Sequence, residues 1–360
     1  MFLVDTEDKL NDLLKNINEE MESVSAEDRF LAVDTEFIRE NLEIPLLCLI
    51  QMATPSIVYL IDTIAINVAP LNNIFSNPDI MKVFHSAEQD LEMLKLSGID
   101  TQNFYDTQLY ESILSTDSCI GYQSIVFRYL DKKLKKNHCM SNWRKRPLSR
   151  KQLEYSANDV FYLRDVYKIQ LKKLIQLNRK NWLIDELRQM KEKSNNPQSM
   201  LNETDQIIYQ QLVEWRNNYA SEMNISTKSI ANNNILNAIC KKGVDFIQSV
   251  KNSRNIKNKN YKKFLIFAEK IAIKVDVKKK PDNQSDVISL LKTFLEIRSR
   301  NCNVANTVIA TSKDLERLVN GERDVKCLSG WRNEIFGNDA LQLLDGKIAL
   351  RIDGTKIIME

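Results

Sequence analysis

The sequence predicts an α/β domain with a mixed sheet, followed by two small all-α domains. Short apolar runs typical of strands concentrate in the first third of the chain, whereas later segments show mainly helical spacing. Two polar, proline-containing segments, KEKSNNPQS (191–199) and KKKPDNQSD (278–286), are typical of linkers. We therefore expect an α/β domain at 1–190, helical domains at 203–275 and 284–345, and a C-terminal tail at 346–360.

The composition is typical of a soluble globular protein. The chain has 360 residues, of which 43% are hydrophobic and 28% charged, and this length suits two or three domains. The N-terminal stretch is acidic and amphipathic, and no apolar run approaches the length of a bilayer span. We therefore expect a cytoplasmic protein with no signal peptide and no membrane partner. The six cysteines form no Cys-x-x-Cys pair and are expected to be reduced.

The first predicted strand is FLAVDTEF, in which four apolar residues precede Asp34 and Glu36 at the strand end. Four further apolar runs predict strands, at 46–54, 57–63, 81–85 and 103–107. The first two of these runs are joined by Pro55 and Ser56, which predicts a hairpin paired with the opening strand. The predicted sheet therefore begins with three antiparallel strands.

Helices are predicted after the strands. Residues 86–98 show helical spacing and end at a glycine, and 148–177 form one long amphipathic helix with Ser149 as its N-cap. Each helical block contains a Trp-Arg pair, Trp215-Arg216 in the first and Trp331-Arg332 in the second. We expect the tryptophans to anchor the cores and the arginines to face RNA. Alternation in the tail predicts a small hairpin.

Asp34 and Glu36 are the first candidate site residues. Side chains alternate along a strand, so positions i and i+2 point to the same face. Two like charges on one face repel each other and are costly to desolvate, so they need a partner. A divalent cation such as Mg²⁺ suits them, because it takes hard oxygen ligands from carboxylates. The alternative interpretation is a solvated strand end.

Three further candidates lie on the predicted helices. Asp90 begins the helix that follows the strand ending FHS, which places it near an edge of the sheet. Tyr155 and Asp159 are four residues apart on the long helix and therefore share one face. The order DTE, HSAEQDL, YSAND predicts that four acids and a tyrosine converge on one site.

The motifs VDTEF, FHSAEQDLEML, FYDTQL, GYQSIV, NWRKRPL and YSANDVFYL follow one another in this order. Together they resemble the ribonuclease D family, in the tyrosine subclass of the DEDD exonuclease superfamily. The helical blocks resemble the paired HRDC domains (helicase and ribonuclease D C-terminal domains) of that family, including VEWRNN in the first and SGWRNEIFG in the second. The resemblance covers almost the whole chain.

The resemblance implies a ribonuclease-H-like 3′–5′ exonuclease domain that binds two divalent ions, Mg²⁺ or Mn²⁺. It implies that Asp34 bridges the ions, that Glu36 and Asp159 complete one ion site, and that Asp90 supports the other. Tyr155 matches the family residue that orients the attacking water. A phenol with a pKa near 10 is a poor base at neutral pH, so an orienting role is the chemically sensible one. The implied product is a 5′-mononucleotide released from a 3′ end.

Histidine chemistry is not expected at this site. The histidine subclass of the superfamily places its histidine five residues before the last aspartate, where this chain has Glu154. His85 matches a family position beside the second motif, and we interpret it either as a substrate contact or as a residue that packs and hydrogen-bonds at a strand end. His138 lies in a basic stretch and is expected to be exposed.

Two segments are strongly basic. Residues 128–151 hold ten Lys and Arg against one acid, and residues 201–285 hold fifteen against eight. Such segments suit a phosphate backbone, although a solvated helix face is the alternative. In NWRKRPL, substrate-binding roles are predicted for Trp143, Arg144 and Arg146, with a core anchor as the alternative for Trp143. Asn142 stands where relatives usually have Asp, which puts a charge-based role there in doubt.

The resemblance thus implies a 3′–5′ exoribonuclease that acts on structured RNA and trims 3′-extended tRNA precursors. It also implies a monomer, and no obligatory protein partner is evident. A 3′–5′ DNA exonuclease of the same superfamily would use the same acids, because the choice of nucleic acid depends on contacts to the 2′-OH. A non-catalytic nucleic-acid-binding protein is the third hypothesis, and the intact set of acids with Tyr155 argues against it.

Overall fold

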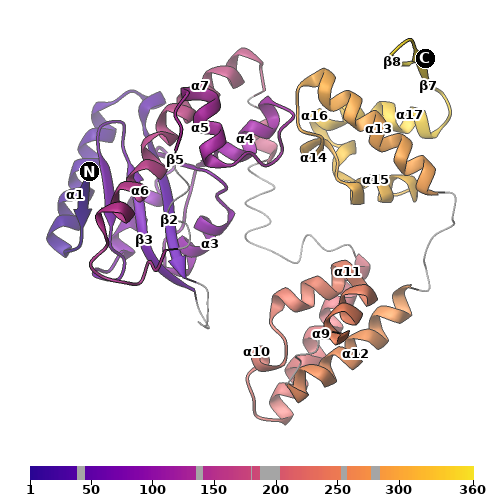
Figure 1. Ribbon diagram of the computed structural model, residues 1–360, viewed down its shortest axis with the longest axis horizontal. Helices are drawn as coiled ribbons and strands as arrows, with labels where there is room; N and C mark the ends of the chain where they lie inside the picture. Colours follow the sequence, from indigo (N-terminus) through magenta and orange to yellow (C-terminus); the bar gives the residue numbers. More distant parts are fainter. Residues whose placement is uncertain (39–44, 135–140, 180, 187–202, 253–257, 277–283) are drawn as a thin grey trace. The chain divides into compact units, whose positions relative to one another are not determined.

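The computed structural model describes residues 1–38, 45–134, 141–179, 181–186, 203–252, 258–276 and 284–360. The chain forms two compact units, one made of Met1–Arg188 together with Asp286–Glu360 and one made of Gln189–Ser285. Figure 1 shows the strands of the N-terminal domain and the helices of the two later blocks. Within the described residues, no helix is long and apolar enough to cross a membrane. The linker predicted at 191–199 lies outside the described residues.

The N-terminal domain is built on a mixed six-stranded sheet in the order β1-β4-β3-β2-β5-β6. Its strands are β1 (Phe2–Val4), β2 (Phe30–Ile38), β3 (Leu46–Ala53), β4 (Val58–Ile61), β5 (Met81–Phe84) and β6 (Phe104–Asp106). β2, β3 and β4 pair antiparallel, as predicted, and the other three pairings are parallel. β1 was not predicted, because its register is set by parallel pairing with the distant β4 rather than by a local turn.

The central strand β2 covers the predicted stretch FLAVDTEF and extends it by one residue to Ile38, so Asp34 and Glu36 lie in its second half. Antiparallel pairing with β3 runs on to Ile38, with a register shift between Glu36 and Phe37. Parallel pairing with β5 covers only 30–32. The acids therefore lie on a strand held firmly on one side and open on the other, beside a bulge of the kind that often flanks active sites.

Helices surround this sheet: α1 (Glu7–Ser23), α2 (Asn72–Phe75), α3 (Glu88–Leu96), α4 (Thr107–Leu114), α5 (Tyr122–Leu130), α6 (Arg150–Phe161) and α7 (Leu163–Gln176). The predicted single helix at 148–177 is two helices, because the chain turns at Tyr162. Ser149 caps α6 as predicted, and Gln152 completes a capping box that fixes where this helix begins.

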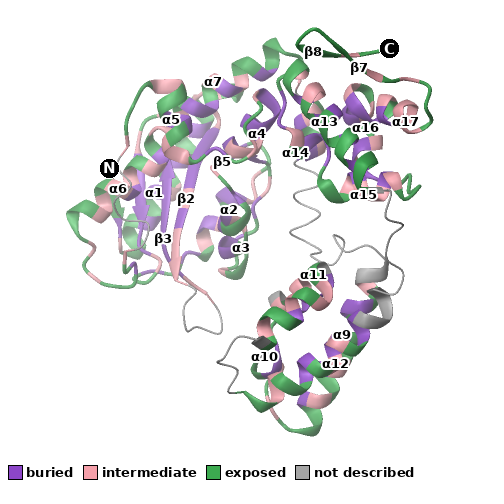
Figure 2. Ribbon diagram, turned by 45° about the vertical axis from the view of Figure 1, so that its right-hand side comes forward, coloured by how far each residue is buried: buried purple, intermediate pink, exposed green. Residues whose placement is uncertain are grey.

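The core of the domain lies between the strands and these helices, and Figure 2 shows β2 and β3 as largely buried. Phe30 and Ala32 of β2 are fully buried, as are Cys48 and Leu49 of β3. The first half of β2 can be apolar on both faces, because helices and neighbouring strands cover it. The rigid half of β2 thereby positions the acidic half that follows.

The middle unit is helical, with α9 (Glu203–Glu222), α10 (Thr227–Ile230), α11 (Asn233–Asn252) and α12 (Lys259–Asp276). Its core includes Leu212 and Phe264, both fully buried. Trp215 packs at the edge of this core, stacked between Tyr219 and Phe267. Arg216 is buried and donates to the carbonyl of Ala231, so the expectation that it faces RNA is wrong.

The C-terminal block contains α13 (Gln284–Cys302), α14 (Asn306–Ile309), α15 (Ser312–Val319), α16 (Gly330–Arg332), a π-helical turn (Asn333–Gly337) and α17 (Asn338–Leu344). Strands β7 (Leu350–Asp353) and β8 (Lys356–Met359) confirm the hairpin predicted in the tail. A linker was predicted at 278–286. Residues 278–283 lie outside the described residues, and the remaining residues, 284–286, form the beginning of α13.

This block packs directly against the N-terminal domain. The indoles of Trp182 and Trp331 stack with their centroids 4.4 Å apart. Arg332 is 1% exposed and forms a buried ion pair with Glu186, so the expectation that this arginine faces RNA is also wrong. Arg179 donates to backbone carbonyls of both parts. The end of the N-terminal domain and the C-terminal block therefore share one interface.

Candidate active site

Three of the predicted acids come together where β2 meets α6. Single carboxylate oxygens of Asp34, Glu36 and Asp159 all lie within 4.8 Å of one another. Strand alternation places the first two on one face of β2, and α6 packs against this strand and brings in the third. This spacing is short enough for one cation to contact all three groups. The structure thus brings together three of the four acids that were expected to converge, and their roles as metal ligands stay a prediction.

Tyr155 lies one helical turn before Asp159 on α6, and its hydroxyl hydrogen-bonds to the Asp159 carboxylate. The capping box at Ser149 fixes the start of the helix and thereby the rotation that points both side chains the same way. The Tyr155 ring lies beside Trp143, with the ring centroids 6.2 Å apart. The phenol is thus held at the carboxylate cluster by a polar contact and a packing contact.

Asp90 approaches β2 from α3 and is bonded to Thr35, but it is not one of the three acids whose oxygens lie within 4.8 Å of one another. The Thr35 hydroxyl donates to Asp90 Oδ1 at 2.5 Å, and Asp90 is only 6% exposed. Thr35 lies between the two acids on β2, so its side chain leaves the opposite face of the strand. No role was predicted for Thr35, although its place inside the DTE motif was a usable signal.

The electrostatics of the cluster are those of acids that lie close together away from water. Burial raises the pKa of Asp34 to about 6. Burial, together with the charge of Asp34, raises the pKa of Asp159 to about 9, and the same two causes raise the pKa of Asp90 well above its usual range. Asp159 Oδ2 is buried and has no hydrogen-bond partner within the described residues. Carboxylate oxygens this close together, with one of them buried and unsatisfied, fit a hard divalent cation.

His85 is occupied by the protein itself. Its Nε2 donates to the carbonyl of Ile120 at 3.1 Å, and its Nδ1 lies 2.9 Å from the hydroxyl of Thr107. Burial lowers the pKa of His85, which favours the neutral ring. These contacts fit the packing and hydrogen-bonding interpretation, and a substrate contact stays a prediction. His138 lies outside the described residues.

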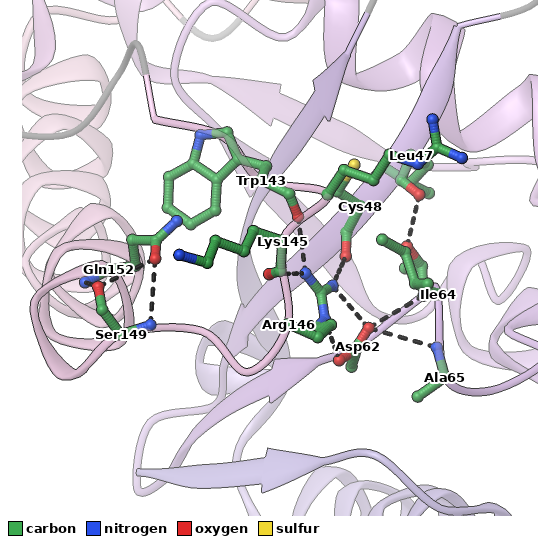
Figure 3. A network of polar contacts seen from close by, with 12 residues as sticks. Leu47, Cys48, Asp62, Ile64, Ala65, Trp143, Lys145, Arg146, Ser149 and Gln152 are labelled. Carbon is green, nitrogen blue, oxygen red and sulfur yellow. Dashed lines mark hydrogen bonds and ion pairs between the residues drawn. The ribbon is translucent and has the colours of Figure 1, made fainter.

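Arg146 joins the NWRKRPL segment to the sheet (Figure 3). Its guanidinium forms an ion pair with Asp62, with Nη2 2.6 Å from Asp62 Oδ1. The same side chain donates to the carbonyls of Cys48 (2.8 Å) and Trp143 (2.7 Å). Arg146 is therefore engaged in holding the segment in place, and its predicted contact to substrate phosphate has to compete with these bonds.

Trp143 and Arg144 differ in exposure although they are neighbours. Trp143 is 2% exposed and belongs to the domain core, which matches its interpretation as a core anchor. Arg144 is exposed, and Asn142 beside it uses its side-chain oxygen to accept the Arg144 backbone N–H at 3.1 Å. Arg144 is thus the member of the predicted substrate-binding trio whose side chain faces solvent.

Tyr122 is a neighbour of the site that the sequence did not single out. Burial raises its pKa well above the usual range, and the charges of Asp159 and Asp34 add to the effect. Its hydroxyl donates to the carbonyl of Asn158 at 2.8 Å, and its ring meets His85 edge-on at 5.5 Å. The motif GYQSIV, matched without an assigned role, was the available signal.

Comparison with known proteins gives consistent results. Residues 1–176 match a family model described as 3′-5′ exonuclease. The chain is 35% identical to ribonuclease D of Bartonella henselae over 91% of its length and 88% of that protein. It is 33% identical to ribonuclease D of Zymomonas mobilis, covering 92% of each chain. Among solved structures, Escherichia coli RNase D matches with a TM-score of 0.68 at 21% identity, over 96% of this chain and 98% of that one, which supports the fold.

Proposed function

This chain belongs to the ribonuclease D family and is a 3′–5′ exoribonuclease, and we propose that it trims 3′-extended tRNA precursors by two-metal-ion hydrolysis. The family gives the reaction class. The substrate, the ions and the roles of individual residues are the proposal. The observation that carries it is the cluster of Asp34, Glu36 and Asp159, whose carboxylate oxygens lie within 4.8 Å of one another.

The cluster supports a cation site on physical grounds. Burial of like charges this close together is unfavourable without a counterion, as the raised pKa values of Asp34 and Asp159 indicate. Asp34, Glu36 and Asp159 would hold one ion, and Asp34 with Asp90 the second. When bound, two such ions stabilise the attacking and the leaving oxygens of an in-line displacement at phosphorus. Either Mg²⁺ or Mn²⁺ suits oxygen ligands.

The remaining side chains of the site orient the reactants. Tyr155 positions the attacking water through its hydroxyl, which the bond to Asp159 already directs toward the carboxylate cluster. Thr35 holds the Asp90 carboxylate beside β2, where it would support the second ion. The product is a 5′-mononucleotide, and the next phosphodiester of the RNA then takes its place at the cluster.

Contact with the rest of the RNA is proposed for exposed basic residues. Arg144, beside the site, is solvent-exposed and suited to a phosphate contact. In the first proposed HRDC domain (203–275), the α12 residues Lys259 and Lys262 are exposed. The division into an exonuclease domain at 1–190, HRDC domains at 203–275 and 284–345, and a tail at 346–360 is part of this proposal.

The lysine contribution is measurable from the salt dependence of RNA binding. Each phosphate contact that is lost lowers the slope of log K against log salt by about 0.7–0.9. Changing both Lys259→Gln and Lys262→Gln is therefore expected to weaken tRNA binding and lower the slope, with little effect on hydrolysis of short oligonucleotides. An unchanged affinity and slope would refute an RNA contact by this face of α12.

One assay tests the function itself. Purified protein is incubated with 3′-extended tRNA, mature tRNA and single-stranded DNA, each with Mg²⁺, with Mn²⁺ and with chelator. The proposal predicts mononucleotide release that requires a metal ion and is fastest on 3′-extended tRNA. Faster degradation of DNA would favour the DNA exonuclease alternative, and release that survives chelation would refute the two-metal mechanism.

A further inference from the structure

Asp106 is a buried carboxylate outside the metal-binding cluster. It ends β6 and is 3% exposed. Its two oxygens accept four backbone N–H groups: those of Ser86, Ala87 and Gln108 at 2.9 Å each, and that of Leu109 at 3.4 Å. No part of the hydrolysis proposed above uses this group. Its hydrogen bonds instead connect two segments of backbone that are twenty residues apart.

The first of these segments is the turn between β5 and α3. Ser86 has φ = +66°, a left-handed conformation that costs free energy for any residue with a Cβ atom. The Ser86 side chain is exposed, so packing of this side chain does not hold the turn. The bonds from the Ser86 and Ala87 N–H groups to Asp106 compensate the strain and fix the backbone where α3 begins.

The second segment is the first turn of α4. Asp106 is the N-cap of this helix, and its side chain accepts from the N–H groups of the first turn. One carboxylate therefore joins the start of α4 to the start of α3. Asp90 lies in the first turn of α3, only three residues after Ala87, so the position of its carboxylate follows from the turn that Asp106 holds.

We propose that Asp106 is a positioning residue for the metal site, which sets the place of Asp90 by clamping the turn at Ser86 and Ala87. Thr35 then fixes the Asp90 carboxylate from the β2 side. This inference rests on the proposed function, because it assigns Asp90 to the metal site. It concerns how the site is held together, and Asp106 itself touches neither ion nor substrate.

Asp106→Asn changes both the hydrogen bonds and the charge of this residue. Asparagine replaces one acceptor oxygen with an NH₂ donor, which cannot accept the N–H bonds that hold the turn, so a positioning role predicts weaker metal binding. Loss of the negative charge also weakens the attraction of a nearby cation and acts in the same direction. A second variant that disturbs the turn without changing any charge therefore separates the two causes.

The experiment measures Mn²⁺ binding by calorimetry and the Mg²⁺ dependence of nucleotide release, on the full chain. For Asp106→Asn we expect Mn²⁺ affinity to fall about 10- to 100-fold, as is typical when a group supporting a metal ligand is removed. The half-saturating Mg²⁺ concentration rises by a similar factor, whereas kcat at saturating Mg²⁺ changes only a few-fold. Unchanged or tighter Mn²⁺ binding would overturn the positioning role.

Two further variants separate positioning from loss of stability. Ser86→Val leaves Asp106 intact but disfavours the left-handed turn, because a β-branched residue rarely adopts positive φ. It is expected to shift the metal dependence in the same direction, and it keeps the test available if Asp106→Asn does not fold. Glu186→Gln removes a buried carboxylate at the interface with the C-terminal block and is expected to lower stability without changing Mn²⁺ affinity.

The readouts also keep this inference apart from the proposed function. Mn²⁺ binding that weakens in both turn variants, in a protein that releases no nucleotides from RNA, would support the positioning role and refute the exoribonuclease proposal. Normal RNA hydrolysis with the same metal dependence in wild type, Asp106→Asn and Ser86→Val would support the exoribonuclease proposal and refute the positioning role. An equal loss of Mn²⁺ affinity in Glu186→Gln would show that general destabilisation is the cause, and the positioning role would be refuted.

Discussion

Arg146 is predicted to contribute to the stability of the fold rather than to RNA binding. Arg146→Met keeps the aliphatic part of the side chain and removes the guanidinium that pairs with Asp62, whose side chain is 7% exposed. Breaking a buried ion pair from one side costs about 3–5 kcal/mol, because the remaining charge is left without its partner. Asp62 keeps hydrogen bonds from the backbone of Ile64 and Ala65, so we expect the lower end, about 3 kcal/mol.

The assay is thermal and urea unfolding of the variant beside its neighbour Arg144→Met. A loss of about 3 kcal/mol corresponds to a fall in Tm of roughly 6–12 °C for a domain of this size. Arg144 is exposed, so its replacement is expected to change stability by less than about 0.5 kcal/mol while weakening RNA binding. In a double-mutant cycle, the double variant Arg146→Met with Asp62→Asn should lose less stability than the sum of the two single variants, by about 1 kcal/mol or more.

One result would refute the stabilising role of Arg146. If Arg146→Met unfolds at the wild-type temperature and loses RNA affinity as Arg144→Met does, the guanidinium contacts phosphate in solution. The ion pair with Asp62 and the bonds to the carbonyls of Cys48 and Trp143 would then contribute little to stability. Arg146 would return to the substrate-binding role predicted from the sequence.

Further predictions concern the metal site and the C-terminal block. Because the pKa values of Asp34 and Asp159 are raised to about 6 and 9 in the folded protein, metal-free stability falls as pH rises from about 4 to 9; Mg²⁺ should therefore raise Tm more at pH 8 than at pH 5, and an equal shift would contradict a site at these acids. Tyr155→Phe removes the hydroxyl that orients water and is expected to lower kcat about 10²-fold while Mn²⁺ affinity stays within a few-fold, measured by single-turnover kinetics and calorimetry; an unchanged kcat would remove Tyr155 from the mechanism. Trp331→Ala ends the stack on Trp182 and should cost about 3–5 kcal/mol by urea unfolding; a loss below about 1 kcal/mol would show that the interface contributes little.

The parts of the site that follow from local periodicity could be predicted from the sequence. Alternation on a strand places Asp34 and Glu36 on one face, and the helical repeat does the same for Tyr155 and Asp159. The helix cap at Ser149 could also be predicted, because the residues that form it lie within four positions of one another. The convergence of these groups came from the order of the motifs and the family resemblance, since no local rule brings β2 and α6 together.

The parts that depend on distant pairing could not be predicted. The bond from Thr35 to Asp90 joins residues 55 apart, and the ion pair of Arg146 with Asp62 joins residues 84 apart. An arginine beside a motif of a nucleic-acid enzyme looks the same in sequence whether it meets a phosphate or a buried aspartate. The break at Tyr162 was missed for a different reason, because the chain turns there without a proline or glycine and with nearly helical angles.

The carboxylates around Asp34 are proposed to hold metal ions that support hydrolysis of RNA from its 3′ end. Single-turnover release of 5′-mononucleotides from 3′-labelled RNA, by wild type and by Asp34→Asn with circular dichroism showing an intact fold, tests it most directly. Metal-dependent release is expected from wild type, with a loss of at least about 10³-fold in the variant, because a carboxylate that would serve both ions is gone. Release at the wild-type rate by Asp34→Asn would refute a metal-binding role of Asp34.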